Sequence, residues 1–216
     1  MTVFFLLGAF CGLIACLGAR FVTRGYESRH FATRKLVLLS YTILTALAAC
    51  AVCTRWLVAR ERLLALLALS FAELHALTDF ENGYIYDSGV VISLVLAALL
   101  RLPFDGFDGA FDLIKGAAAG AIPLTAISIF KPSWMGRGDA LLMAGLGALM
   151  GWEAALLAVY FAFIIGGIIA FCLLLSGLAN RYTFLPFAPF ILLGTACAVL
   201  IRWEVLERAG IFISLI

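Results

Sequence analysis

The sequence predicts an all-α, polytopic integral membrane protein. Hydrophobic residues make up 65% of the 216 residues and charged residues only 13%, whereas a water-soluble domain has about 45–50% apolar and about 25% charged residues. Apolar runs such as 63–69 and 154–175 are continuous rather than alternating, which favours membrane helices over the strands of a membrane barrel. Because a helical span needs about 20 apolar residues, the composition allows about eight transmembrane helices.

Hydropathy along the chain places these helices in order. We expect spans at residues 3–19, 36–54, 63–78, 88–102, 113–130, 140–151, 154–176 and 186–201. The fourth and sixth are short for a hydrocarbon core about 30 Å thick. Short helices with irregular backbone at membrane depth are typical of polar sites enclosed by protein.

The chain shows no sign of division into domains. It has no internal repeat, and its longest polar stretch runs only from 20 to 35. The N-terminal stretch lacks a basic region and an A-x-A site, so we interpret it as a retained first span. We therefore expect residues 1–216 to form one membrane-embedded domain, with the lipid bilayer as its surroundings. The net charge of +2 is too small to indicate nucleic acid as a partner.

The loop charges favour one orientation. With the N-terminus outside, the inner loops carry more Lys and Arg than acidic residues, and the outer loops carry slightly fewer. The positive-inside rule favours this arrangement. In this orientation the third predicted span runs inward and the sixth runs outward, so the end of one and the start of the other lie on the same inner face.

The cysteines and histidines do not form the pattern of a metal site. All six cysteines fall in apolar runs, so we expect neither a disulfide framework nor a zinc site. His30 and His75 are the only histidines, and they do not form the closely spaced pair of a zinc protease. We interpret His75 as a packing residue or a partner of Glu73 or of a neighbouring span. We expect no metal and no cofactor.

Three carboxylates lie within nine residues at the end of the third predicted span: Asp79, Glu81 and Asp87. Ionisable residues at membrane depth are costly and usually functional. The simpler interpretation is that Asp79 is a helix-end carboxylate paired with His75, one turn earlier on the same face.

A fourth carboxylate opens the sixth predicted span, in the sequence Gly136-Arg137-Gly138-Asp139. The two glycines allow the backbone to approach a substrate closely. A carboxylate in the first turn of a helix accepts hydrogen bonds from the N-terminal amides. Taken alone, Asp139 also fits an ordinary N-cap.

Asp79 and Asp139 can meet, because both lie on the inner face. Two carboxylates a few ångström apart cannot both ionise, so the pKa of one rises. The ionised group then activates water to attack a peptide carbonyl, while the protonated group polarises that carbonyl and protonates the leaving amine. This pattern predicts aspartic proteolysis at a membrane boundary. A proton-coupled transporter that uses buried carboxylates as a relay is the alternative.

Three motifs in order resemble the type IV prepilin leader peptidase family of G-x-G-D membrane aspartic peptidases. They are D-x-x-x-x-x-I-x-D at 79–87, G-x-G-D at 136–139, and L-P-F-A-P-F at 185–190 followed by Gly194. The resemblance implies eight spans and a catalytic pair formed by Asp79 and Asp139. It also implies cleavage of the basic leader from prepilin or pseudopilin-like substrates, at the cytoplasmic face of the inner membrane.

The same resemblance gives supporting roles to the neighbouring residues. It implies that Glu81 and Asp87 position the basic leader or hold their loop. The residues before Asp139 would support the substrate or the loop in the same way: Gly136, Arg137 and Gly138.

The chain departs from the family at two places. Many members have a lysine two residues after the second aspartate, where this chain has Leu141; Arg137 is the nearest cation that can replace it. This departure also motivates a further alternative, a catalytically inactive scaffold of a secretion system. The segment 20–35 is short and contains no cysteine, so we expect a short form without the cysteine-rich methyltransferase region.

Overall fold

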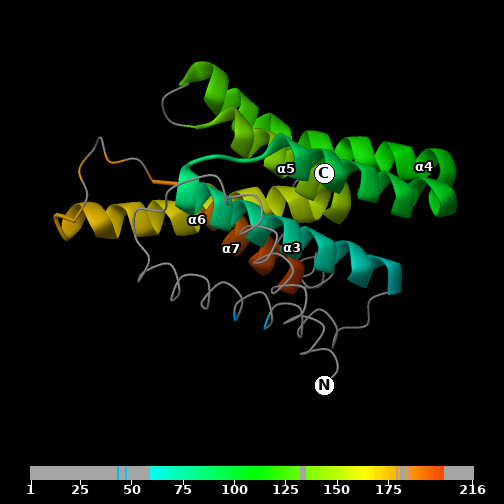
Figure 1. The fold of residues 1–216 in the computed structure, drawn as a ribbon, viewed down its shortest axis with the longest axis horizontal. Coiled ribbons are helices and arrows are strands. Elements are labelled where there is room, and N and C mark those ends of the chain that lie inside the picture. The colour runs from blue at the N-terminus through cyan, green and yellow to red at the C-terminus, as the bar shows by residue number, and fades with distance from the viewer. Residues whose placement is uncertain are drawn as a thin grey trace, which may run out of the picture.

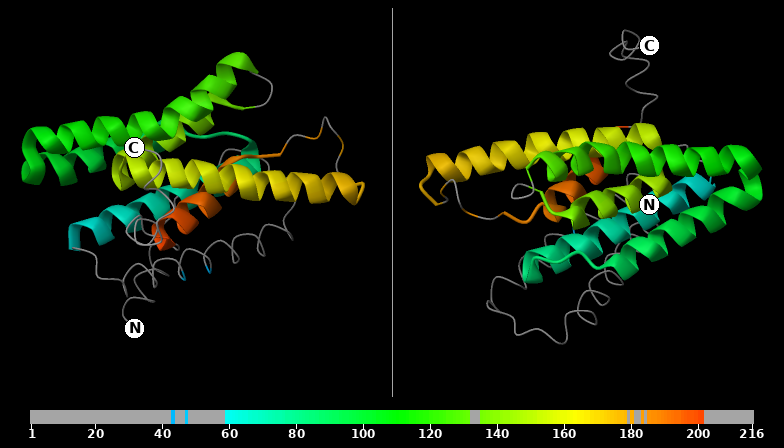
Figure 2. Two further views of the ribbon diagram at one scale, coloured as in Figure 1. Left: turned by 180° about the vertical axis from the view of Figure 1, so that it is seen from behind. Right: turned by 90° about the horizontal axis from the view of Figure 1, so that it is seen from above.

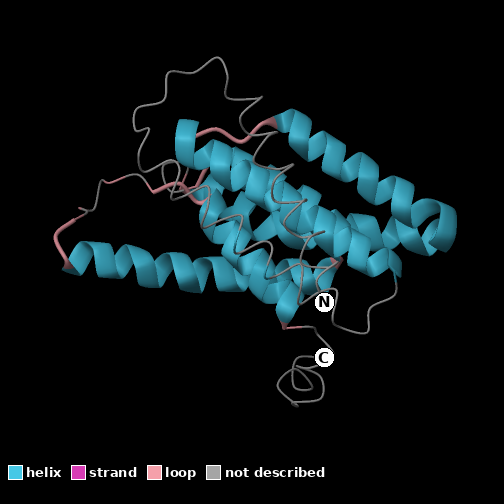
Figure 3. Cartoon of the chain, turned by 60° about the horizontal axis from the view of Figure 1, so that its bottom comes forward, coloured by secondary structure: helices cyan, strands magenta, loops and turns pink. Residues whose placement is uncertain are grey.

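The computed structural model describes residues 59–131, 135–178 and 185–201, together with the single positions 43, 47, 180 and 183. Every regular element of this part is a helix (Figure 3). The helices are α3 (Ala59–Asn82), α4 (Asp87–Phe130), α5 (Arg137–Met150), α6 (Trp152–Leu175) and α7 (Ala188–Leu200). The predicted all-α class is therefore confirmed for the described residues.

Three of these helices are long and apolar enough to cross a membrane. The qualifying segments are Arg60–Phe80, Asp87–Phe130 and Trp152–Leu175. Large hydrophobic side chains on α4 and α6 point outward, among them Phe107, Phe130 and Phe171. An apolar exterior of this extent is suited to lipid rather than to water.

The prediction of about eight transmembrane helices is not supported by the described residues. The expected spans 3–19 and 36–54 lie outside them, apart from positions 43 and 47. The expected spans 88–102 and 113–130 correspond to two helical arms that are numbered together as α4 and are separated by a kink at Gly106. The expected spans 140–151 and 186–201 correspond to α5 and α7, which have 14 and 13 residues. At about 1.5 Å per residue, helices of this length fall short of a hydrocarbon core about 30 Å thick.

The two arms of α4 are joined at a sharp bend. Gly106 interrupts the helix with φ 55° and ψ −123°, a conformation that residues with a Cβ rarely adopt. Figures 1 and 2 show that the chain folds back at this end, so that the arms lie side by side. The bend explains why hydropathy alone separated α4 into two segments.

The short helix α5 lies at the centre of the described part. Most of its residues are buried, and its most extensive contacts are with α4, while α7 packs against α3 and α6 (Figure 1). A Cβ added to Gly116 in α4 would collide with the carbonyl oxygen of Gly147 in α5, and one added to Gly147 would collide with that of Gly116. Glycine at both positions therefore lets the two backbones touch.

The C-terminal end of α5 is held by a side chain from α4. Arg101 donates from Nε to the carbonyl oxygen of Ala148 at 3.1 Å and from Nη2 to that of Leu149 at 2.9 Å. The last carbonyls of a helix have no partner within the helix, so these bonds satisfy groups that would otherwise be buried and unbonded. They also help to fix where α5 ends.

Candidate active site

Asp79 lies near the C-terminal end of α3, with 6% of its surface exposed. Its Oδ2 accepts a hydrogen bond of 3.0 Å from the backbone N–H of Ala188. Ala188 is the first residue of α7, and the first N–H groups of a helix are free to bind an anion. The start of α7 therefore stabilises the ionised form of the Asp79 carboxyl.

Asp139 lies in the first turn of α5, where the sequence predicted it, with 8% of its surface exposed. Gly136 is the N-cap of this helix, and its backbone N–H donates to the Asp139 carboxylate. An acidic residue three positions into a helix commonly reaches back to the N-cap in this way. The other oxygen, Oδ1, accepts no hydrogen bond from any described residue.

The structure brings these two carboxyls together although they lie 60 positions apart in the sequence. Burial raises the pKa of Asp139 to about 7, the charge of Asp79 raises it as well, and the hydrogen bond from Gly136 opposes the rise. At neutral pH the pair can therefore hold one proton, with a substantial share of Asp139 protonated. A protonated acid beside an ionised one is the arrangement that general acid–base chemistry needs.

The supporting residues predicted from the sequence are placed differently from the pair. Asp87, the first residue of α4, and Arg137, the first residue of α5, are both exposed. Glu81 lies in the last turn of α3, and its side chain is outside the described part. The two supporting side chains of this set that the structure describes, Asp87 and Arg137, are therefore exposed, whereas Asp79 and Asp139 are buried.

The two glycines before Asp139 have close neighbours that leave little room for a Cβ. A Cβ at Gly138 would lie 3.0 Å from the Cβ of Ile85, and one at Gly136 would lie 3.2 Å from Oδ2 of Asp139. From the sequence we predicted that these glycines let a substrate approach the backbone closely. The structure adds that glycine admits the α3–α4 loop, which carries Ile85. A cavity of about 330 Å³ lies beside Gly136 and Arg137.

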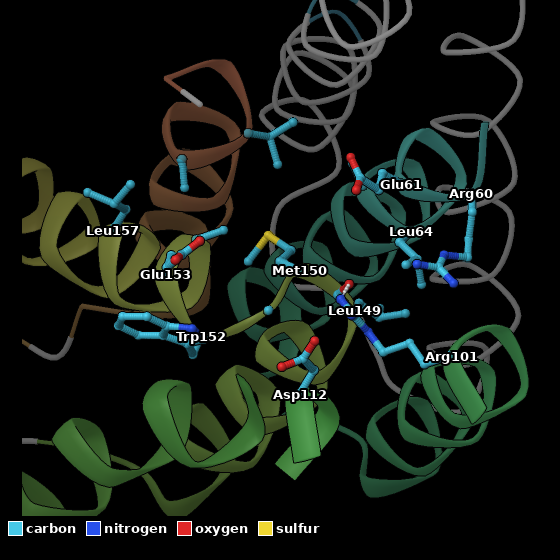
Figure 4. Close-up of a pocket in the computed structure, with 15 residues that line it drawn as sticks. Arg60, Glu61, Leu64, Arg101, Asp112, Leu149, Met150, Trp152, Glu153 and Leu157 are labelled. Atoms are coloured by element: carbon cyan, nitrogen blue, oxygen red, sulfur yellow. Dashed lines mark hydrogen bonds between the residues drawn. The ribbon is translucent and has the colours of Figure 1, made fainter. Parts of the chain in front are cut away.

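A second cavity lies at the opposite end of the bundle. It has a volume of about 440 Å³ and is lined by the start of α3 and α6 and by the ends of α5 and α7. Figure 4 shows Arg101 beside Leu149, with Asp112, Glu61 and Glu153 around the same space. It is separated from the aspartate pair by the length of α5.

Some groups at the site were not foreseen. The sequence singled out 185–190 only for its resemblance, yet the amide of Ala188 is the partner of Asp79. Pro189, at the second position of α7, is the local signal for a helix N-terminus there. The sequence also gave no role to Arg101, and it did not foresee the two carbonyl partners of His75.

Among the described residues, no group of three His, Cys, Asp or Glu side chains is arranged to hold a metal ion.

These features define a class: a helical membrane protein with two buried aspartates meeting at the ends of neighbouring helices. The comparisons with known proteins then identify the family. A model of the type IV leader peptidase family matches residues 64–171, half of the chain, so the chain belongs to this family. The resemblance predicted from the motifs is confirmed, and both Asp79 and Asp139 fall inside the matched region.

Two curated relatives agree with this assignment. A prepilin leader peptidase/N-methyltransferase of Bacillus subtilis (strain 168) is 29% identical over 136 residues, which cover 63% of this chain and 54% of the relative. A protein of the same name from Stutzerimonas stutzeri is 28% identical over 130 residues, covering 58% of this chain and 45% of the relative. The chain therefore spans about half the length of the curated relatives it matches. No solved structure matches the chain significantly.

Proposed function

We propose that this protein is a membrane aspartic endopeptidase that removes the basic leader from type IV prepilin-like substrates. Family membership supports a peptidase. The observation that carries the aspartic mechanism is the pairing of Asp79 and Asp139, two buried carboxyls; burial first, and then the charge of Asp79, raises the pKa of Asp139. Both curated relatives are named as prepilin leader peptidases, which supports prepilin or pseudopilin-like proteins as substrates.

The surroundings of the pair support different roles for the two acids. The Ala188 amide favours the ionised form of Asp79. Asp139 is also buried and also accepts an amide bond, from Gly136, but burial and the charge of Asp79 outweigh this bond and raise its pKa to about 7. We therefore assign Asp79 as the general base and Asp139 as the general acid.

The proposed reaction balances with one water molecule. Asp79 takes a proton from water as the water oxygen bonds to the peptide carbonyl carbon, and Asp139 donates a hydrogen bond to the carbonyl oxygen. The C–N bond then breaks as Asp139 gives its proton to the leaving nitrogen. Asp79 is left protonated and Asp139 ionised, and transfer of one proton between them restores the starting state.

Charged positions around the pair support a basic leader as the substrate segment. Asp87 is exposed at the start of α4, and Glu81 lies two residues after Asp79 in the last turn of α3. We propose that these acids attract the basic leader and that Arg137, in place of the family's usual lysine, supports the loop. The loop charges of the sequence favour the cytoplasmic face of the inner membrane for this end of the protein.

We assign this chain the peptidase activity and not the methyltransferase activity included in the names of its relatives. The family model that matches the chain is that of a leader peptidase, and the segment 20–35 lacks the cysteines of the methyltransferase region that the resemblance describes. A transfer of methyl groups to a synthetic mature pilin by the purified protein would contradict this part of the proposal.

The direct test is cleavage of a peptide with a basic leader ending in glycine, followed by an apolar helix, by purified protein in detergent. The expected result is cleavage at the leader boundary by the wild type and none by Asp139→Asn. Several such substrates left intact by a well-folded wild type would overturn the proposal, as would an Asp139→Asn variant as active as wild type.

A further inference from the structure

A buried histidine lies one helical turn before Asp79 and has no part in the mechanism above. His75 in α3 has only 1% of its surface exposed. Burying an imidazole requires partners for its ring nitrogens. The partners of the two ring nitrogens therefore show which parts of the chain His75 connects.

The two ring nitrogens of His75 face different parts of the chain. Nδ1 lies 2.7 Å from the carbonyl oxygen of Phe71, one turn earlier in α3. Nε2 lies 3.3 Å from the carbonyl oxygen of Tyr86, the N-cap of α4. A neutral imidazole donates to one of these carbonyls and an imidazolium donates to both. The second contact ties the end of the α3–α4 loop to α3.

The start of α4 is shaped to receive this ring. A Cβ added to Gly89 would lie 2.6 Å from both Cε1 and Nε2 of His75. The same Tyr86 carbonyl also accepts a bond of 3.0 Å from the Gly89 N–H. The imidazole therefore fits against the backbone of the first turn of α4, at a position where a larger residue would displace it.

The loop that His75 holds reaches the second aspartate. Ile85 precedes Tyr86, and its Cβ lies 3.0 Å from the position of a Cβ on Gly138. Gly138 directly precedes Asp139. A continuous set of contacts thus leads from the helix that carries Asp79, through His75 and the loop, to the residue beside Asp139.

We propose that His75 is a positioning residue that sets the geometry of the aspartate pair. Its contact with Tyr86 holds Ile85 against Gly138, so the segment carrying Asp139 stays in place relative to α3 and Asp79. This inference rests on the proposed peptidase function. It predicts an effect on the catalytic step and not on substrate binding, because His75 itself is buried.

Two substitutions separate the loop contact from the contact within α3. The amide nitrogen of glutamine stands as many bonds from Cβ as Nε2 of histidine, and that of asparagine as many as Nδ1. His75→Gln therefore keeps a donor for Tyr86, whereas His75→Asn keeps a donor only for Phe71. Ser70→Ala is the matched control, since among the described residues its hydroxyl donates to the Leu66 carbonyl, within α3.

The expected result is a fall in kcat of roughly 10- to 100-fold for His75→Asn, the size that a displacement of about 1 Å in a catalytic group produces. KM should stay within about twofold, and His75→Gln and Ser70→Ala should keep most of the wild-type kcat. Gly89→Ala, which pushes the ring away from Tyr86 without altering His75, should lower kcat in the same way. The Gly89→Ala variant therefore tests the inference even if His75→Asn does not fold.

Hydrogen exchange of segments 83–89 and 136–139 gives a second readout that needs no activity. The loss of the loop contact should speed exchange in both segments in His75→Asn but not in His75→Gln. If the wild type is active and His75→Asn and Gly89→Ala are equally active, the inference is overturned and the peptidase proposal stays intact. An inactive wild type overturns the peptidase proposal, and unchanged exchange in His75→Asn then overturns the positioning role separately.

Discussion

Carboxylates at the two ends of the helix bundle have different partners and different exposure. At one end, Nη1 of Arg60 lies 2.9 Å from Oδ1 and 2.8 Å from Oδ2 of Asp105, and both side chains are about one-third exposed. At the other end, Asp79 and Asp139 are almost fully buried. There the hydrogen bonds to the carboxyls come from backbone amides of Ala188 and Gly136.

The difference teaches how surroundings set the chemistry of one residue type. An arginine partner supplies a full positive charge, and the carboxylate beside it forms an ion pair with it. A backbone amide orients a carboxyl but does not neutralise it. Two such carboxyls near each other therefore share a proton, and a shared proton is what an acid–base pair needs. The arginine-paired end is suited to holding the structure together and the amide-bonded end to catalysis.

The sharpest contrast compares equivalent substitutions at the two ends. Asp79→Asn and Asp139→Asn should each lower kcat/KM by about 10³-fold or more, because general acid–base groups contribute about 10²–10⁴-fold and each acid here has a separate role. Asp105→Asn should stay within about threefold of wild type, since an exposed ion pair contributes about 0–1 kcal/mol. Cleavage assays on variants with unchanged melting temperatures provide the measurement. Substantial activity in either member of the pair would remove the acid–base assignment.

The second contrast concerns the glycine before Asp139. Gly138→Val should lower kcat by roughly 10- to 100-fold, because even a Cβ there meets Ile85 at 3.0 Å. Adding Ile85→Ala should restore part of the loss by making room. Kinetics of the single and double variants test this. A Gly138→Val variant with full function would favour a carboxylate relay, which does not need a close backbone.

Much of the fold follows from local patterns in the sequence. Continuous apolar runs identify the helices, and a glycine-containing turn followed by an apolar run places Asp139 in a first turn. The contact between Asp79 and Ala188 joins residues 109 positions apart, and no local pattern encodes it. The length of α5 depends likewise on tertiary packing. Arg101 donates to the carbonyls of Ala148 and Leu149 at the end of this helix, 47 and 48 positions away in the sequence. The catalytic roles of the aspartates stay predictions.

The third contrast separates stability from catalysis. Arg101→Gln should lower the free energy of unfolding by about 1–3 kcal/mol, because it leaves buried carbonyls of α5 without their charged donor. Below the melting temperature, kcat/KM should change by less than about threefold, since Arg101 bonds the C-terminal end of α5 and Asp139 lies in its first turn, at the opposite end. Thermal unfolding and cleavage assays on the same preparation distinguish the two. A loss of activity as large as that of Asp139→Asn, with the fold intact, would show that the ends are not independent.

The smallest expected effects belong to the acids outside the pair. Asp87→Asn and Glu81→Gln should raise KM for substrates with basic leaders by roughly two- to fivefold, as expected for charges that steer a ligand across water. The effect should shrink at high salt and with a leader that has fewer basic residues. Salt-dependent kinetics make the comparison. Equal KM values for basic and neutral leaders in wild type and both variants would remove these acids from substrate recognition.

The central claim is that Asp139 keeps a proton near neutral pH, and infrared titration of the carboxyl bands tests it most directly. With its pKa raised to about 7, Asp139 is protonated below that pH and ionised above it, so its protonated-carboxyl band should disappear with a midpoint near 7. The band should be missing in Asp139→Asn, and cleavage by the wild type should decline above the same pH. A carboxyl spectrum with no titration above about pH 5, where an ordinary aspartate with a pKa near 3.9 is already ionised, would contradict the account.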